Sequence, residues 1–198
     1  MSSTDQIKTY VAKRINSILA NPSESAARSS LAKLRRGIGH MPGELPELWG
    51  EYLLDLPEEL MGRGSNISRA EWAIYTTLTL FALHQQGKDR ASQPMHQQNI
   101  SLGTAANRLI KNENDDRERI SRRFYPVAMA SDMAELSHHL RGLITLMRSQ
   151  GISMDYIRLS GDLYNFQDPD RVDAVRLRWG EDFCRIYNDK ENNTEEEN

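Results

Sequence analysis

The sequence predicts an all-α protein, a helical bundle built of two small sub-bundles. Helix-forming residues, chiefly Leu, Ala, Arg, Met and Glu, fill the middle of the chain. Apolar residues recur at intervals of three and four, the spacing of one helix face, and β-branched residues do not gather into strand-like runs. With 198 residues, 38% of them hydrophobic, the chain is long and apolar enough to bury a substantial core.

Two helices are expected before residue 40. The first covers about 5–20, where apolar residues recur at helical spacing. The Asn-Pro-Ser break that follows provides Ser23 as the next N-cap, and the second helix then runs to about Arg36. The glycines at 37 and 39 are expected to supply its left-handed cap.

Prolines and glycines punctuate residues 40–68, so most of this segment is expected to be loop, with a short helix between Pro46 and Leu54. Ser68 and Glu71 form a capping box, which starts the next helix. That helix is apolar on most sides, the pattern of a helix at the buried centre of a bundle.

The central helix is expected to end near Gly87. The polar stretch 85–99 is then predicted to be an exposed loop joining the two sub-bundles, residues 1–92 and 99–188. The remaining residues, 189–198, are expected to form an acidic, disordered tail.

In the second half, Ser101 is the predicted N-cap of a helix reaching about Lys111, and a turn at 112–116 leads into a basic helix over about 117–130 with a kink at Pro126.

Three further helices complete the prediction. Ser131 or Asp132 begins a helix with a regular apolar stripe, which Gly151 ends. The next covers about 154–166. Asp168 followed by Pro169 predicts the start of the last helix. Its expected buried residues are Val172, Val175, Trp179, Phe183 and Ile186.

The charges are segregated along the chain. The net charge is -3, but the tail holds five acidic residues and one lysine, which leaves the body at about +1. Residues 8–40 contain seven bases and one acid, whereas residues 44–59 contain six acids and no base. A total near neutrality therefore still allows a basic face that holds phosphates.

Arginine supplies most of the positive charge and gives the candidate nucleic-acid-binding residues. Their spacing places three arginines on one face of the basic helix, and two more at a helix end beside glycines, where phosphate could approach the backbone. The candidates are Arg35, Arg36, Arg108, Arg119, Arg122 and Arg123. The alternative for the basic helix is a solvated face neutralised by Glu113, Asp115, Asp116 and Glu118.

Catalytic and metal-binding motifs are not evident. The glycines at 37 and 39 lack the preceding strand and following Lys-Ser of a phosphate loop. His138 and His139 point about 100° apart on a helix and cannot share an ion. Asp155 and Asp162 could share a helix face but lack a catalytic partner. We therefore expect no enzyme activity, no metal and no cofactor.

The chain is expected to work in the cytoplasm. The N-terminus lacks the apolar segment of a secretory signal, and the most apolar stretch is too short to span a bilayer. Cys184 is the single cysteine, which excludes an internal disulfide and suits a reducing compartment. Its apolar neighbours predict a small buried side chain.

Several segments match a known family in order and spacing over roughly residues 28–188. They are Leu34-Arg35-Arg36-Gly37, Glu71-Trp72-Ala73, Ile100-Ser101-Leu102-Gly103, Arg122-Arg123-Phe124 and Trp179-Gly180-Glu181-Asp182-Phe183. In this order the chain resembles the small subunit of the type I-E CRISPR Cascade complex, the CasB family.

The resemblance implies an all-helical, non-catalytic subunit for antiviral defence. Two copies would lie head to tail, against the backbone subunits and the large subunit, and help stabilise the R-loop formed by guide RNA and target DNA. Arg35, Arg36, Arg122 and Arg123 match the family's arginine pairs. Arg69 and Arg171 match more loosely and join the candidate nucleic-acid-binding residues.

Other functions remain open on the residues alone. A helical adaptor that binds only protein would use the same basic patches against acidic partners. A helical hydrolase would need carboxylates or histidines converging in a pocket, which the spacing does not indicate. A helix-turn-helix regulator would need a compact helix-Gly-turn-helix, which we do not find.

Overall fold

The computed structural model describes residues 1–64 and 66–185, and over these residues the regular structure is helical, without a sheet. The predicted all-α class is confirmed. The main helices are α1 (Ser3–Leu19), α2 (Glu24–Arg36), α3 (Trp49–Tyr52), α4 (Arg69–His84), α5 (Leu102–Asn107), α6 (Glu113–Met129), α7 (Met133–Gln150), α8 (Tyr156–Phe166) and α9 (Val172–Cys184). Two single 3-10 turns, η1 (Pro46–Leu48) and η2 (Glu58–Leu60), lie in the loop-rich segment.

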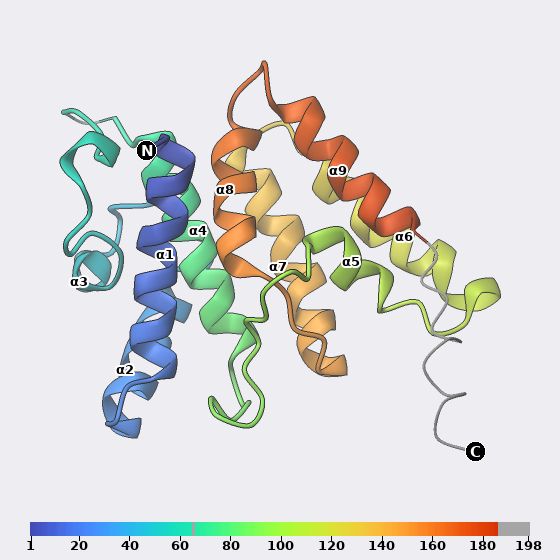
Figure 1. The fold of residues 1–198 in the computed structure, drawn as a ribbon, viewed down its shortest axis with the longest axis horizontal. Helices are drawn as coiled ribbons and strands as arrows, with labels where there is room; N and C mark the ends of the chain where they lie inside the picture. Colours follow the sequence, from blue (N-terminus) through green and yellow to red (C-terminus); the bar gives the residue numbers. More distant parts are fainter. Residues whose placement is uncertain (65, 186–198) are drawn as a thin grey trace.

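The helices pack in two layers (Figure 1). In one layer α2, α4, α7 and α6 lie side by side in that order. In the other, α8 packs between α1 and α9, and α5 lies against α9. The α3 segment and α6 therefore stand at opposite ends of the molecule's long axis (Figure 1).

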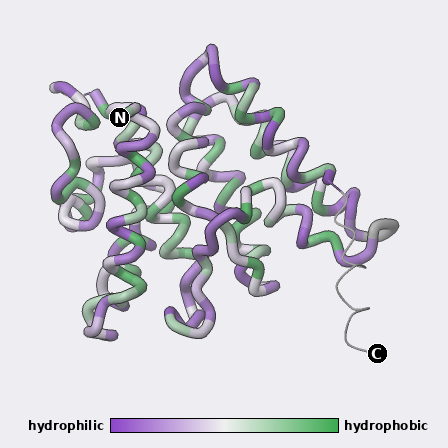
Figure 2. The backbone as a smooth tube through the Cα atoms, in the orientation of Figure 1, coloured by the Kyte–Doolittle hydropathy of each residue, from purple (hydrophilic) through white to green (hydrophobic). Residues whose placement is uncertain are grey.

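Helix α4 is the centre of the fold. It contacts α1, α2, α7 and α8, and it buries residues on every side, as its all-round apolar sequence predicts. Hydrophobic and hydrophilic stretches alternate along the surrounding helices (Figure 2), so each of them turns one apolar side inward. One continuous core of buried side chains draws on both halves of the chain. The division at 92–99 into two sub-bundles stays a prediction.

Local signals set most helix ends. Ser23, Ser68 and Ser101 are N-caps as predicted, and the capping box of Ser68 with Glu71 is complete. Gly151 ends α7 in the left-handed conformation, with φ 68°. The first helix begins earlier than expected, because Ser2 and Asp5 form a capping box of their own.

Three predicted boundaries are wrong. Helix α5 ends at Asn107, so Lys111 lies in a turn, and α6 already begins within the expected turn. The last helix begins at Val172, with Arg171 and not Asp168 at its N-cap. One Asp168 carboxylate oxygen accepts the Asp170 backbone N–H, and the other pairs with Arg69.

Two predicted environments also differ. Cys184 is exposed rather than buried. The polar stretch 85–99 is partly anchored, because the buried Gln85 side chain bonds to backbone groups of the loop and Met95 is buried. Ile186 and the expected tail at 189–198 lie outside the described residues. Within the described chain, no helix is long and apolar enough to cross a membrane.

Helix α5 packs directly against the backbone of α9 at Gly103. A Cβ placed on Gly103 would lie 2.3 Å from the Trp179 carbonyl oxygen and 2.9 Å from the Phe183 nitrogen, both backbone atoms of α9. No side chain fits at this position unless the two helices separate.

We therefore expect Gly103→Ala to destabilise the protein by about 1–3 kcal/mol, the usual cost of overpacking. Gly142→Ala is the matched control, because Gly142 is an exposed residue of α7 with open space around its Cβ position. That change should raise stability by up to about 1 kcal/mol through helix propensity. Urea unfolding followed by circular dichroism measures both, and equal effects would contradict the packing argument.

A buried histidine joins α4 to α8. His84 Nδ1 lies 2.8 Å from the Tyr156 hydroxyl, and both residues are fully buried. Burial lowers the pKa of His84 to about 4, and the positive charges of Arg148 and Lys88 act in the same direction, against the opposing effect of the Ile152 backbone. The imidazole is therefore neutral in the folded protein at physiological pH.

The lowered pKa of His84 makes the free energy of unfolding fall in acid. The folded pKa of about 4 lies below the ordinary 6.5, so between these values the unfolded chain binds the proton and the folded chain does not. Stability is complete above about pH 6.5, and on the order of 3 kcal/mol is lost as pH falls to about 4. Urea unfolding at a series of pH values should show a flatter profile for His84→Gln and an unchanged profile for the exposed His138→Gln.

Candidate nucleic-acid interface

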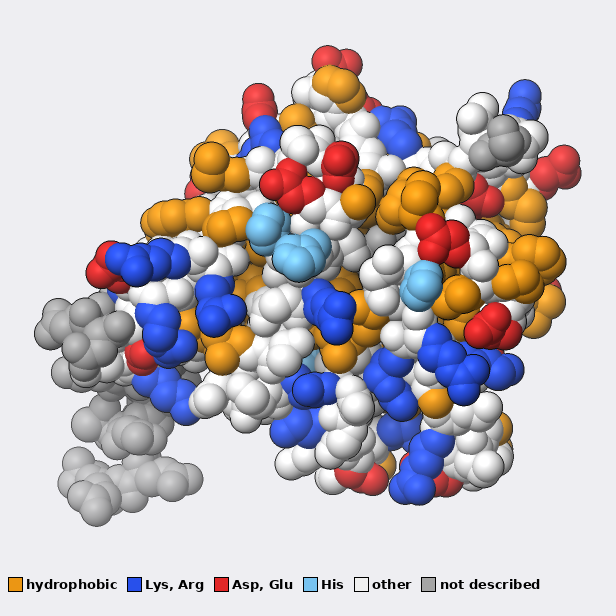
Figure 3. Space-filling model, turned by 180° about the vertical axis from the view of Figure 1, so that it is seen from behind, with side chains coloured by type: hydrophobic (Ala, Val, Ile, Leu, Met, Phe, Trp, Pro, Cys, Tyr) orange, Lys and Arg blue, Asp and Glu red, His pale blue; other side chains and the backbone are white. Residues whose placement is uncertain are grey.

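Positive side chains gather on the face formed by α2, α4, α7 and α6. Figure 3 shows Lys and Arg spread across the lower half of this face, from the α6 end to the α2 end. We call this surface the basic band. Its members on the three helices are Arg28, Arg35 and Arg36 on α2, Arg141 and Arg148 on α7, and Arg119, Arg122 and Arg123 on α6.

At the α2 end, two arginines from distant parts of the sequence lie near each other. Burial, and then the positive charge of Arg148, lower the pKa of Arg35. Arg148 is held in place by hydrogen bonds to Gln86 Oε1, 2.7 Å away, and to the Leu83 carbonyl. Neither arginine has an ion pair among the described residues, so an anion bound beside them would be favourable for both.

A hollow of about 550 Å³ opens beside Arg35. It is lined by α2 and by the start of the loop after α4, including Lys88 and Arg90. Glu24 neutralises part of this charge, because it pairs with both Arg28 and Arg90. No local pattern in the sequence indicated Lys88, Arg90 or Arg148, since only the packing of α2, α4 and α7 brings them to Arg35. Arg28 precedes Arg35 by seven residues, two turns of the same helix, and this spacing could have indicated it.

The glycine beside the first arginine pair has a structural role. Gly37 has a right-handed helical backbone conformation, with φ -68°. The left-handed conformation after α2 is that of Gly39, with φ 88°. A Cβ on Gly37 would lie 2.7 Å from the Tyr75 hydroxyl, which donates a hydrogen bond to the Gly37 carbonyl. The Tyr75 hydroxyl therefore occupies the space beside Gly37 where a phosphate was expected to approach the backbone. Of the two glycines, only Gly39 has open space beside it.

On α6 the three arginines differ in how they are paired. Arg119 lies 2.6 Å from Asp116, and Arg122 pairs with Glu118. Both side chains of the second pair are about three-quarters exposed, so their pairing contributes little and phosphate oxygens can replace the carboxylate. Arg123 is exposed and has no ion pair within the described residues. Of the four acids expected to neutralise this face, Asp116 and Glu118 pair with arginines, while the side chains of Glu113 and Asp115 lie outside those that the structure describes.

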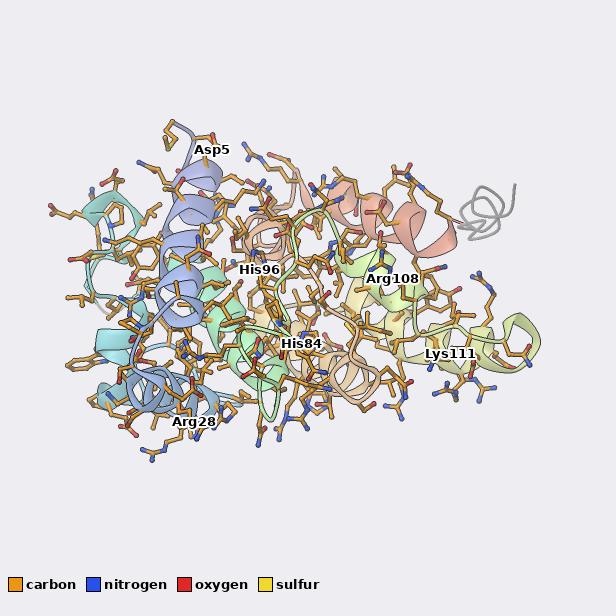
Figure 4. All side chains as sticks on the ribbon, turned by 60° about the horizontal axis from the view of Figure 1, so that its bottom comes forward. Asp5, Arg28, His84, His96, Arg108 and Lys111 are labelled. Carbon is orange, nitrogen blue, oxygen red and sulfur yellow. The ribbon has the colours of Figure 1, made fainter. Side chains whose placement is uncertain are left out.

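The other candidates lie elsewhere. Arg108 caps the end of α5, and Figure 4 shows it and Lys111 at the opposite end of the molecule from Arg28. Arg69 and Arg171 share the carboxylate of Asp168, at 3.0 Å and 3.7 Å. This carboxylate raises the pKa of Arg69, whose guanidinium also lies over the Tyr164 ring. These two arginines are thus committed to the junction of α4, α8 and α9.

The carboxylates and histidines that could suggest catalysis have structural partners. Asp155 caps α8 and accepts a hydrogen bond from the Asn99 backbone, while the buried Asp162 bonds the Trp179 indole and pairs with Arg178. His84 and His96 lie near the middle of the molecule in Figure 4, and no group of three metal-ligating side chains forms among the described residues.

Comparisons with known proteins agree with this architecture. The chain is similar to CasB from Thermobifida fusca, with 33% identity, coverage of 91% of this chain and 98% of that one, and a TM-score of 0.71. A Cse2-family protein from Thermus thermophilus (22% identity, 92% and 98% covered, TM-score 0.61) and M. ruber CasB (21% identity, 88% and 92% covered, TM-score 0.63) share the fold. No curated protein matches the sequence.

The family model of CRISPR-associated protein Cse2 matches residues 30–183, which include every member of the basic band except Arg28. A match over most of the chain, together with the likeness to a CasB structure above 30% identity, establishes the family. The chain therefore belongs to the CRISPR-associated Cse2 family, also called CasB, the small subunits of Cascade.

Proposed function

We propose that this protein is a non-catalytic Cascade subunit that holds nucleic-acid backbone and stabilises the R-loop, in the cytoplasm. The basic band is the observation that carries the proposal. It follows one face from α2 to α6 (Figure 3), and within it Arg35 and Arg148 lie near each other, each without an ion pair among the described residues. Such a surface binds phosphates without reading sequence.

The mechanism is electrostatic. Forming an R-loop exchanges one duplex for another of similar stability, so modest contacts to the displaced DNA strand shift the balance. The arginines of α6 would exchange exposed carboxylate partners for phosphate oxygens, and the Arg35 and Arg148 pair would gain the counter-charge that it lacks. Guide RNA and target DNA are the nucleic acids of this assembly.

Protein partners are supported by exposed apolar side chains on two separate parts of the surface. Trp49 and Leu54 are 50% and 57% exposed at the α3 segment, while Met129, the last residue of α6, and Leu177, in the middle of α9, are 78% and 63% exposed. Two different apolar surfaces suit a heterologous contact with a second copy, such as a head-to-tail one. The backbone and large subunits of Cascade are the further partners.

A purely protein-binding adaptor is the alternative. It is favoured by the arginines that already have carboxylate partners, Arg69 and Arg171, which show that this chain also uses arginine to join helices. An adaptor would enter the complex without changing the behaviour of DNA.

The first test removes two charges from the band. Arg122→Ala with Arg123→Ala should shorten R-loop lifetime in the assembled complex and leave thermal unfolding unchanged, because both side chains are exposed. The logarithmic salt slope of single-strand binding should fall by about 0.7 for each arginine–phosphate interaction that the substitutions remove.

The matched control is Lys13→Ala with Arg63→Ala, which removes two exposed charges outside the band. This variant should keep both the lifetime and the salt slope. If the two double variants behave alike at physiological salt, the band does not hold the strand and the adaptor function is favoured.

The second test concerns the two apolar surfaces. Leu54→Glu and Leu177→Glu should each weaken self-association of the full chain, because a charge in an apolar contact is costly. If the two surfaces touch each other, the double variant should lose less than the sum of the single losses. Sedimentation velocity measures association, and Thr145→Glu at an exposed position of α7 is the control. Additive losses would place the two surfaces in separate contacts.

A further inference from the structure

A second, smaller hollow interrupts the face that carries the basic band. It has a volume of about 250 Å³ and lies between the turn that follows α2, the first part of α4 and the middle of α7. We call it the Trp72 groove. Its lining residues are Ile38, Gly39, His40, Met41, Trp72, Ala134, Ser137, His138 and Arg141.

The backbone explains why the groove is open. Gly39, with φ 88°, turns the chain away after α2 and has open space around it. On the opposite wall, α7 presents the small side chains of Ala134 and Ser137. Between the walls, Trp72 is partly buried and packs against the core, so its indole is held in place before any ligand arrives.

The chemistry of the lining combines aromatic rings with positive charge. An indole, two imidazoles and the exposed thioether of Met41 provide flat and polarisable contacts, and Arg141 provides a guanidinium. None of the lining side chains is a carboxylate. One lining residue, His40, pairs with a carboxylate outside the lining, that of Glu44 at 2.8 Å. By contrast, the larger hollow beside Arg35 includes Glu24 and Asp89 and no aromatic ring.

The groove lies on the track of the basic band. Arg141 precedes Arg148 by seven residues, which is two helical turns, so both project from the same side of α7. A strand that follows the band from Arg148 toward α6 therefore passes the mouth of the groove. Single-strand-binding surfaces pair such a positive track with rings on which bases stack.

We propose that the Trp72 groove receives one unpaired nucleobase of the bound strand, stacked on the Trp72 indole, with a neighbouring phosphate on Arg141. This assignment rests on the proposed function, because the band must first hold the strand. The base is recognised by its flat face, so the contact tolerates any base. The groove would fix where bases turn inward along a strand that is otherwise held by its phosphates.

The test compares two strands of equal length and charge at low salt, an oligothymidylate and its abasic counterpart, each titrated against the full chain. One stacked base should make the oligothymidylate bind roughly 5- to 150-fold more tightly, equivalent to about 1–3 kcal/mol. A strand carrying 5-iodouracil should also form a photo-crosslink to the tryptic peptide that contains Trp72.

Two variants remove the groove in different ways. Trp72→Leu removes the ring, and Ala134→Leu narrows the groove from an exposed position of α7 without adding an aromatic face or changing any charge. Both should abolish the preference for the base-bearing strand. Tyr125→Leu is the control, because Tyr125 is an aromatic residue of α6, 53% exposed and outside the groove.

The outcomes separate this inference from the function on which it rests. Equal binding of the two strands, or a preference that survives both groove variants, overturns the nucleobase site and leaves the basic band intact. If neither strand binds at low salt, the proposed nucleic-acid function falls, and the nucleobase site falls with it.

Discussion

The burial of α4 is the constraint on which the rest of the fold depends. A helix that is apolar all round must be covered on every side, and α1, α2, α7 and α8 provide that cover. Two of these four helices come from each half of the chain, so the core is continuous across both. Covering α4 on one side with α2 and α7 brings Arg35 beside Arg148, and it also sets the turn after α2 across a gap from α7. The interface and the groove therefore follow from packing a single helix.

The parts of the fold that depend on neighbouring residues could be predicted from the sequence. The capping box at Ser68, the left-handed end at Gly151 and the apolar stripe of α7 each involve residues within one or two turns, so local physical rules were sufficient. Prediction failed at Asp168, where the pairing partner is Arg69, far away in the sequence. It also failed at Gly37, because the hydroxyl that fills its space belongs to Tyr75.

The candidate nucleic-acid interface was also predictable only where residues close in sequence determine it. The spacing of Arg119, Arg122 and Arg123 showed that they share a helix face, and all three are exposed. The spacing could not show that Arg69 and Arg171 share one carboxylate, nor that Arg148 completes the pair with Arg35. Those relations depend on which helices pack together, and a single sequence does not encode that in any local pattern.

The distribution of charge matters more here than its total. The chain has a net charge of -3, yet its arginines fall into two groups with different surroundings. One group is fixed by carboxylates at helix junctions, as Arg178 is by Asp162 and Arg158 by Asp182. The other lies on the basic band, where the ion pairs are exposed and replaceable. A moderately acidic protein can therefore present a positive track on one face.

The direction of that track connects the two proposals on partners. The band runs from α2 to α6, and the exposed apolar residues of the α3 segment lie at the α2 end of the long axis (Figure 1). A head-to-tail contact between copies through that end would join one band to the next and lengthen the track without any new contact within a subunit. Once one copy holds the strand, binding of the attached second copy to the same strand is effectively intramolecular. The two copies together therefore hold the strand more tightly than either copy alone. A surface of weak, exchangeable arginine contacts is sufficient for stable binding under that arrangement, and it also explains why an isolated chain needs no strong affinity of its own.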